Sequence, residues 1–300
     1  MNPADIPHHA LVGLDIGGTK THGVRWLNGQ VIAEAKSGSA NTQNVSLDTA
    51  RENLAKVFES LGSEAIDMVI AGAGGIDTQQ DAERLRELIA THAPTAQINV
   101  VHDSRLILAA GHAATGMAVI LGTGSAFWGI NDEGKEARSG GWGYLLGDEA
   151  SGYWMGREAV RFTLREANRG QPPSLLSRLV LEANQVTRAE ELIGRFHADA
   201  DRRHWAQQSP LVFTANDSAD PGASTIIDEA VAHVVASLGD LATILGIHGP
   251  VIIGGGLGMY QPVYQQRLRA ALSSQGFENV RFLEVDPVFG VPFLASKSSP

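Results

Sequence analysis

Short apolar runs alternate with amphipathic stretches along most of the chain, and each run has the length of a β-strand. The dipeptide Asn28-Gly29 separates two of these runs, and it is a strong signal for a tight hairpin turn. Two further runs start at Met117 and Val251, and both break into glycine. The remaining runs predict strands at residues 11–16, 23–27, 31–35, 67–72, 98–101, 127–130 and 280–285.

Stretches of helical periodicity fill most of the space between the predicted strands. The clearest is 227–245, where apolar residues recur at spacings of three and four. Residues 172–216 have a helical composition but no clear division into elements. Strands that alternate with helices predict an α/β fold, with mixed or parallel sheets covered on both faces. The other predicted helices span 47–61, 81–92, 103–114 (starting at Asp103 or Ser104) and 150–168, and one more follows the strand at Val251 and ends near 272.

The pattern of the first 27 residues restarts at Met117. In both places an apolar strand breaks into glycine and threonine, and a second strand follows. The similarity is one of organisation rather than identity. It predicts two topologically related halves with a boundary near residues 115–118.

Three of the predicted strands end in glycine-rich turns, which can bring backbone N–H groups close to an anion because glycine has no Cβ. Glycine after a strand is usually only a turn, so each alone is weak evidence. Two turns with the form Gly-Thr, each starting one of two related halves, favour a clamp for a polyphosphate, and the third would leave space for a base. The turns are Gly17-Gly18-Thr19, Gly122-Thr123-Gly124-Ser125 and Gly254-Gly255-Gly256.

Composition narrows the class of protein. The 300 residues carry a net charge of −10 with no basic cluster, which argues against nucleic acid or an anionic membrane as a partner. There are no cysteines, so disulfides, thiol catalysis and cysteine-ligated metals are excluded. The first nine residues lack the apolar core of a signal peptide, and the apolar run 251–259 is too short and glycine-rich to span a bilayer. These features predict a soluble, cytoplasmic protein.

One segment carries a specific resemblance. Ser139-Gly-Gly-Trp-Gly-Tyr-Leu-Leu-Gly-Asp-Glu-Ala-Ser-Gly-Tyr-Trp154 resembles the Gly-Gly-Trp-Gly…Gly-Asp-Glu-x-Ser-x-Tyr-Trp segment of the N-acetylglucosamine kinase branch of the BadF/BadG/BcrA/BcrD ATPase family. This family is part of the actin-like sugar kinase and Hsp70 ATPase superfamily. The resemblance implies two actin-like (ribonuclease H-like) lobes, each a mixed sheet flanked by helices, with an active-site cleft between them. The lobes would comprise residues 1–116, completed by a C-terminal helix at about 288–300, and 117–287, with a helical insertion at 172–216.

The resemblance assigns the catalytic base to Asp103, in Val-His-Asp-Ser, which matches the aspartate that deprotonates the accepting sugar hydroxyl. An aspartate between a strand and a helix is also a good N-cap, and this second interpretation stays open. His102 is the neighbour of Asp103, but successive residues of a strand point to opposite faces, so a role for it in the site is not expected.

The resemblance also implies a site for ATP and Mg²⁺. Asp15 matches a carboxylate that acts on Mg²⁺ through water, a metal that prefers oxygen ligands. The adenosine motif corresponds to the three glycines Gly254, Gly255 and Gly256. The remaining phosphate contacts would come from Gly17, Gly18, Thr19 and Lys20 in the first turn and from Gly122, Thr123 and Gly124 in the second.

For the sugar, the residues implied by the resemblance lie in two stretches. A carboxylate such as that of Asp148 can bridge two adjacent hydroxyls. Asp148 could instead cap the helix that follows, together with Ser151, and Trp142 could be a core aromatic. Ala126 stands where the family can carry asparagine, which puts one polar contact in doubt. The matching positions are Asn41, Asp103, Ser125, Gly141, Trp142, Gly143 and Asp148.

The implied activity is transfer of phosphate from ATP to the 6-hydroxyl of an amino sugar, most simply N-acetylglucosamine to its 6-phosphate, by an ATP:hexosamine phosphotransferase that forms a homodimer. Glucosamine is an alternative acceptor, because the pocket for the 2-substituent is not evident from these residues. A non-catalytic sugar or nucleotide sensor is an alternative of another class. The lack of cysteine argues against a dehydratase activator with an iron–sulfur cluster and against the zinc-bearing sugar kinases. Pro292 predicts a terminal helix that starts late or is short, because proline is tolerated only in the first helical turn.

Overall fold

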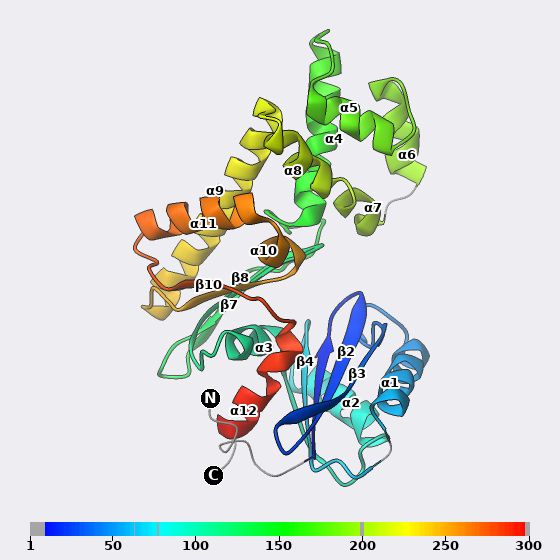
Figure 1. The fold of residues 1–300 in the computed structure, drawn as a ribbon, viewed down its shortest axis with the longest axis vertical. Helices are drawn as coiled ribbons and strands as arrows, with labels where there is room; N and C mark the ends of the chain where they lie inside the picture. Colours follow the sequence, from blue (N-terminus) through cyan, green and yellow to red (C-terminus); the bar gives the residue numbers. More distant parts are fainter. Residues whose placement is uncertain (1–9, 63, 77, 199–200, 298–300) are drawn as a thin grey trace. The chain divides into compact units, whose positions relative to one another are not determined.

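The computed structural model describes residues 10–297 apart from 63, 77, 199 and 200. The chain divides into two compact units, drawn in Figure 1: a first unit from residues 1–114 and 283–300, and a second unit from residues 115–282. The first nine residues and the last three positions of the predicted C-terminal helix lie outside the described residues.

The first unit is built on a five-stranded mixed sheet with the order β3-β2-β1-β4-β5. The first three strands are antiparallel neighbours, and the last two run parallel to β1. The strands are β1 (Ala10–Ile16), β2 (Lys20–Leu27), β3 (Gln30–Gly38), β4 (Met68–Ala73) and β5 (Gln97–His102). The helices are α1 (Leu47–Leu61), α2 (Gln79–Ala90), α3 (Asp103–Ala110), the short 3₁₀ helix η3 (Pro287–Gly290) and α12 (Val291–Lys297).

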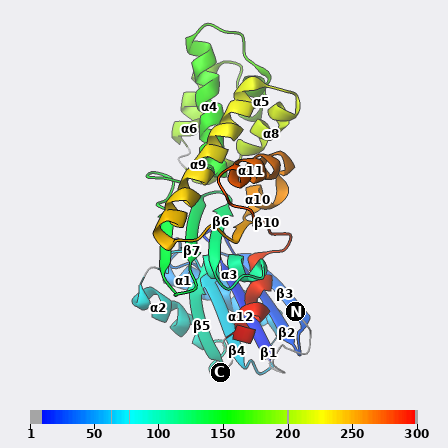
Figure 2. The same cartoon turned by 90° about the vertical axis from the view of Figure 1, so that its left-hand side faces the viewer.

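Alternation along β1 assigns a set of helices to each face of this sheet. Val12, Leu14 and Ile16 are buried in a cluster with apolar residues of α1 and α2. Leu11 belongs to a second cluster, formed with α3, η3 and α12. Figure 2 shows α3 and α12 side by side over the strands. Gly13 points to this second face, where a Cβ would lie 2.8 Å from Val291 Cγ2, so only glycine lets α12 pack this closely.

The hairpin predicted at Asn28-Gly29 is confirmed. Both residues have positive φ, 50° and 78°, as a two-residue turn with the twist of the flanking strands requires. The turn joins β2 to β3, with Leu27 paired to Gln30.

The second unit repeats the architecture of the first. Its five-stranded sheet has the order β8-β7-β6-β9-β10, with antiparallel pairs β6–β7 and β7–β8 and parallel pairs β6–β9 and β9–β10. Each strand therefore has the same neighbours and directions as its counterpart in the first unit, and the prediction of two related α/β halves is confirmed. The strands are β6 (Gly116–Leu121), β7 (Ser125–Ile130), β8 (Glu136–Gly140), β9 (Val251–Gly254) and β10 (Val280–Phe282).

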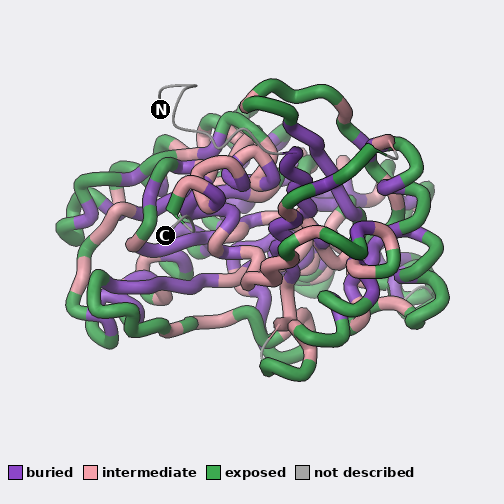
Figure 3. The backbone as a smooth tube through the Cα atoms, turned by 90° about the horizontal axis from the view of Figure 1, so that it is seen from below, coloured by how far each residue is buried: buried purple, intermediate pink, exposed green. Residues whose placement is uncertain are grey.

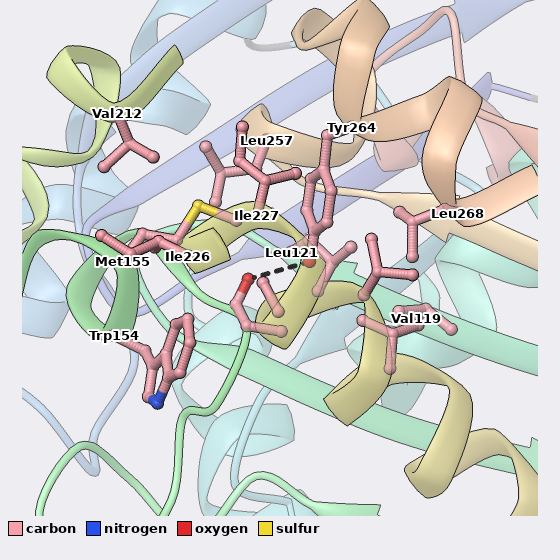
Figure 4. Close-up of a cluster of buried hydrophobic side chains, with 14 of the residues drawn as sticks. Val119, Leu121, Trp154, Met155, Val212, Ile226, Ile227, Leu257, Tyr264 and Leu268 are labelled. Atoms are coloured by element: carbon pink, nitrogen blue, oxygen red, sulfur yellow. Dashed lines mark hydrogen bonds between the residues drawn. The ribbon is translucent and has the colours of Figure 1, made fainter. Parts of the chain in front are cut away.

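A set of helices packs against the second sheet and forms the larger apolar core. Tyr264 lies fully buried in this core, and its hydroxyl donates a 3.3 Å hydrogen bond to the Ala150 carbonyl oxygen, marked in Figure 4. Figure 3 shows the buried residues concentrated along the strands and the inner sides of the helices. The helices are α4 (Gly152–Asn168), α5 (Leu175–Ala183), η2 (Ala189–Glu191), α6 (Leu192–Ala198), α7 (Arg202–Ala206), α8 (Ser209–Asp217), α9 (Pro221–Leu245), α10 (Gly256–Tyr260) and α11 (Pro262–Ser274).

Some element boundaries differ from the prediction. The strand β8 was not predicted, α9 begins six residues before 227, and β10 ends at Phe282 rather than 285. Pro292 is the second residue of the seven-residue α12, in its first turn, so the prediction of a short helix is confirmed. Over the residues that the structure describes, none of the helices combines the length and apolar character needed to cross a bilayer.

Candidate active site

Asp15 occupies the end of β1 on the face that α3 and η3 cover, since it follows Leu11 and Gly13 in the alternation. Burial is the main cause that raises the pKa of its carboxyl, to about 7, and the negative charges of Asp103 and Asp286 raise it further. Lys20 acts in the opposite direction. A carboxylate held in the field of two others is a place where a cation is stabilising.

Asp103 is the first residue of α3, directly after β5. Gly72 and Gly74, at the end of the adjacent strand β4, allow α3 to pack close to this strand. A Cβ on Gly72 would lie 2.4 Å from Leu106 Cδ1, and one on Gly74 would lie 3.0 Å from Asp103 Oδ2. The buried Oδ1 atom of Asp103 has no hydrogen-bond partner within the described part of the chain. Its carboxylate is therefore able to accept a proton or a hydrogen bond from a ligand.

The helix α3 is capped by His102 rather than by Asp103, so the N-cap interpretation of Asp103 is wrong. The Nδ1 atom of His102 accepts a 3.3 Å hydrogen bond from the Ser104 N–H and lies 3.0 Å from Asp103 Oδ1. The prediction that these neighbours point apart is also wrong, because Asp103 already has helical backbone geometry and strand alternation no longer applies.

Asn41 lies beside Asp103, and the two flank Gly74. The buried side chain of Asn41 donates from Nδ2 to the Gly74 carbonyl oxygen at 2.9 Å and accepts the Gln43 N–H at 2.9 Å. A Cβ on Gly74 would lie 3.8 Å from Asn41 Nδ2 as well as 3.0 Å from Asp103 Oδ2. The first unit thus brings together the predicted base and a predicted sugar residue.

The first glycine turn closes the hairpin between β1 and β2. The Gly17 N–H donates to the Lys20 carbonyl oxygen at 2.9 Å, whereas the N–H groups of Gly18 and Thr19 make no hydrogen bond to any described residue. The Lys20 ammonium is exposed and lies 3.7 Å from Asp286 Oδ2. Two consecutive free N–H groups beside a lysine form a local anion site.

The second glycine turn closes the hairpin between β6 and β7 over a span one residue shorter. The Gly122 N–H donates to the Gly124 carbonyl oxygen at 3.0 Å, and the N–H groups of Thr123 and Gly124 have no partner in the described chain. The carbonyl oxygens of Gly122 and Thr123 accept from Gly152 and Tyr153 at the start of α4, at 2.8 and 3.0 Å. The start of α4 therefore orders this turn and leaves its N–H groups free.

Asp148 contacts the second turn directly. Its Oδ1 accepts a 3.2 Å hydrogen bond from the Ser125 N–H, and its buried Oδ2 has no partner in the described structure. Burial raises the pKa of Asp148, while the hydrogen bond from Ser125 lowers it. Ser151 caps α4, so the alternative of Asp148 as the helix cap is wrong. The hydroxyl of Ser125 donates to the Glu149 carbonyl oxygen at 2.7 Å, which fixes this side chain.

Trp142 lies on the surface, so its interpretation as a core aromatic is wrong. Its side chain is 55% exposed, and the Arg138 guanidinium stacks 4.1 Å from the ring centroid. Gly141 and Gly143, on either side, both have positive φ. A Cβ on Gly141 would lie 3.3 Å from the Cβ of Ala126.

The third glycine turn follows β9, and its glycines serve different purposes. Gly254 is buried at the end of the strand. Gly255 has a φ of 83°, and a Cβ there would lie 2.5 Å from the Leu121 carbonyl oxygen, so this glycine brings the turn against β6. Gly256 starts α10 and faces open space. A Cβ on Gly256 would meet no atom within 4 Å, in contrast to one on Gly255.

Buried polar residues that were not predicted lie behind the first turn. His22 is almost fully buried, with Glu34 Oε1 2.8 Å from its Nε2 and Asp286 Oδ2 2.8 Å from its Nδ1. Ser39 contacts the turn itself. The sequence did contain a signal for such residues, namely a polar residue between apolar neighbours in a predicted strand. Such a residue is buried with its neighbours and therefore needs a hydrogen-bond partner.

Asp15 fits a role on Mg²⁺. No cluster of three or more histidine or carboxylate side chains that could chelate a metal occurs in the described ranges. Mg²⁺ in phosphoryl-transfer sites is held by one or two carboxylates together with substrate phosphates and water. A single carboxylate whose pKa is raised by burial and by neighbouring negative charge matches that donor set.

Comparison with known proteins gives one family match and two curated relatives. Residues 12–290 match the BadF/BadG/BcrA/BcrD ATPase family. A Clostridium acetobutylicum protein named N-acetylmuramic acid/N-acetylglucosamine kinase is 28% identical over 252 residues, covering 81% of this chain and 82% of that protein. A Dictyostelium discoideum protein named N-acetyl-D-glucosamine kinase is 28% identical over 315 residues, covering 96% of this chain and 98% of that protein.

Among solved structures, a candidate N-acetylglucosamine kinase from Porphyromonas gingivalis has a TM-score of 0.77 at 22% identity. The match covers 96% of this chain and 99% of that chain. At this level of identity the likeness shows the fold.

Proposed function

Because the chain belongs to the BadF/BadG/BcrA/BcrD ATPase family, we propose that it is a kinase that transfers phosphate from ATP to the 6-hydroxyl of an amino sugar. The preferred acceptor is N-acetylglucosamine, in line with the names of both curated relatives. Glucosamine is the alternative acceptor for the same mechanism. A cytoplasmic location and a homodimer stay predictions from the sequence.

The observation that carries this proposal is the pair of equivalent glycine turns. Each turn uses its first glycine N–H to close a hairpin and leaves the next two N–H groups free. Because these N–H groups are already in place before the ligand binds, they can stabilise the charge of a phosphate without a rearrangement of the turn. In this assignment Gly18 and Thr19 donate to one phosphate group, and Thr123 and Gly124 to another. The third turn, with open space at Gly256, receives the adenosine.

Asp103 acts as the general base in this assignment. In this assignment the Asp103 carboxylate, whose Oδ1 lies 3.0 Å from His102 Nδ1, accepts the proton of the 6-hydroxyl as the oxygen attacks the γ-phosphorus. Gly74 lets the Asp103 carboxylate lie close to the end of β4, because a Cβ there would lie 3.0 Å from Asp103 Oδ2. Asp15 would hold Mg²⁺ through water. When bound, the metal would neutralise part of the negative charge of the phosphates.

In this assignment Asn41 and Asp148 orient the sugar. Asn41 lies beside Asp103 in the first unit and would hold a ring hydroxyl. Asp148, whose buried Oδ2 lacks a partner, would accept hydrogen bonds from sugar hydroxyls. Gly141, Trp142 and Gly143 would form the wall of this subsite.

Replacement of the base tests the proposal. In Asp103→Asn, kcat for N-acetylglucosamine phosphorylation should fall by a factor on the order of 10³, because a general base contributes about 10²–10⁴-fold. The sugar Kd measured by calorimetry should change less than about threefold. Asp81→Asn, on the exposed start of α2, is the matched control and should keep full activity. Unchanged turnover in Asp103→Asn would overturn the assignment.

A further inference from the structure

The segment that carries Asn41 is tied to the first glycine turn by one buried hydroxyl. Ser39, which is 5% exposed, donates from Oγ to the Gly17 carbonyl oxygen at 2.7 Å. The same Oγ accepts the Asn41 N–H at 3.1 Å. A serine hydroxyl has one proton, and here it is given to the turn while a lone pair receives the backbone of Asn41.

Neighbouring contacts restrain this link on both sides. Thr21, fully buried in β2, accepts the Ala40 N–H on Oγ1 at 2.9 Å. Asn53 of α1 donates from Nδ2 to the Ser39 carbonyl oxygen at 2.8 Å. Gly38 makes room for that amide, because a Cβ there would lie 2.8 Å from Asn53 Nδ2. Because β2 and α1 restrain the backbone around Ser39, we expect a movement of the glycine turn to displace mainly residues 40–41.

We infer that Ser39 is a positioning residue that couples nucleotide binding to sugar binding. The inference rests on the proposed function, in which Gly18 and Thr19 contact phosphate and Asn41 contacts the sugar. Phosphate bound at the turn restrains Gly17, the hydroxyl of Ser39 transmits the restraint, and Asn41 is held in its sugar-binding position. Each ligand therefore tightens the binding of the other, as reciprocal coupling requires.

The position of Ser39 in the network distinguishes it from other nearby serines. Ser37, two residues earlier on β3, donates its hydroxyl to the Asn53 and Gly38 carbonyl oxygens and contacts neither the turn nor Asn41. Its replacement should alter the packing of β3 on α1 without altering the link. Ser37→Ala is thus a matched control for Ser39→Ala.

The test compares the Kd of N-acetylglucosamine with and without saturating Mg·ADP in wild type, Ser39→Ala and Ser37→Ala. Wild type and Ser37→Ala should bind the sugar at least about fivefold more tightly with nucleotide, a typical allosteric coupling. In Ser39→Ala the two values should agree within about 1.5-fold. Coupling equal to wild type in a folded Ser39→Ala protein would overturn the inference.

A second measurement on the wild type keeps the inference testable if Ser39→Ala does not fold. Mg·ADP alone, without sugar, should slow amide hydrogen exchange at residues 40 and 41, and unchanged exchange there would overturn the inference. The two proposals fail in different ways. A wild-type protein that phosphorylates the sugar but shows no coupling contradicts only this inference, whereas no phosphorylation of any amino sugar contradicts the proposed function and the inference together.

Discussion

The Asp148 carboxylate accepts the backbone N–H of Ser125 at 3.2 Å and thereby joins two segments of the second unit. One of its oxygens holds the second glycine turn, and the other is buried without a partner in the described structure. In the proposed function, this side chain lies next to the phosphate turn and binds the sugar. Its neighbour Gly124 has to be glycine, because a Cβ there would lie 2.7 Å from Asp148 Oδ2.

Asp148→Asn should raise the KM for the sugar about tenfold or more and leave the KM for ATP within about twofold. The asparagine oxygen can still accept from Ser125, so the turn is kept, but the charged acceptor for sugar hydroxyls is lost, a difference of about 1.5–3 kcal/mol for a charge-assisted hydrogen bond. Steady-state kinetics with each substrate varied checks this. Glu149→Gln, at the adjacent position, serves as the control, and an unchanged sugar KM in Asp148→Asn would argue against Asp148 in the sugar site.

The pKa of Asp15, about 7, predicts a pH-dependent stability. An unfolded aspartate titrates near 4, so between pH 4 and 7 the folded state binds more protons and stability falls as pH rises. Asp15→Asn removes this effect. We expect the free energy of unfolding of Asp15→Asn to exceed that of wild type, and this difference should grow by on the order of 2 kcal/mol from pH 5 to pH 8. Denaturant titration without nucleotide measures both values. A difference independent of pH would contradict the prediction.

Gly255 and Gly256 should respond differently to alanine. Gly255→Ala places a Cβ against the Leu121 backbone at positive φ and should destabilise the protein by at least about 2 kcal/mol. Gly256→Ala meets no atom within 4 Å and should keep wild-type stability, while its KM for ATP rises severalfold. Thermal unfolding and ATP kinetics on both variants check the pair. Equal stability of the two would contradict the packing argument.

Arg25 should be the most important buried charge of the first unit. Its guanidinium donates to the carbonyl oxygens of Leu61, Gly62, Glu64 and Ala65 and to the Glu64 carboxylate. Arg25→Met removes the donor of these hydrogen bonds and should lower the free energy of unfolding by about 1–3 kcal/mol. The exposed Arg51→Met should change it by less than about 0.5 kcal/mol. A loss below 1 kcal/mol in Arg25→Met would contradict this role.

The sequence predicts those elements whose signal is local. The hairpin at Asn28-Gly29 depends on two residues that tolerate positive φ, and the buried strands depend on apolar runs. The strand β8 (Glu136–Gly140) has no such signal, since it is polar and is formed by pairing with β7, where Arg138 lies opposite Trp128. The start of α9 did have a local signal. Asp220 caps the helix and Pro221 occupies its first turn, but the apolar periodicity becomes regular only later.

The site shows the same division between local and long-range information. The glycine turns that follow strands can be recognised in the sequence, and they predict where the phosphate groups bind. The bond between Asp148 and Ser125 joins residues 23 positions apart, and the capping of α3 by His102 depends on side-chain geometry. Ser39 links Gly17 to Asn41 only because β3 lies next to β2. No local pattern contains these contacts.

The most direct test of the central claim is an ADP-release assay with Mg·ATP and five candidate acceptors: N-acetylglucosamine, glucosamine, N-acetylmuramic acid, N-acetylmannosamine and glucose. We expect ADP formation with N-acetylglucosamine at the highest kcat/KM, and phosphorus–proton NMR should place the new phosphate on the 6-oxygen. Absence of ADP release with every one of these sugars, from a protein that binds ATP and is folded, would show that the protein is not an amino-sugar kinase.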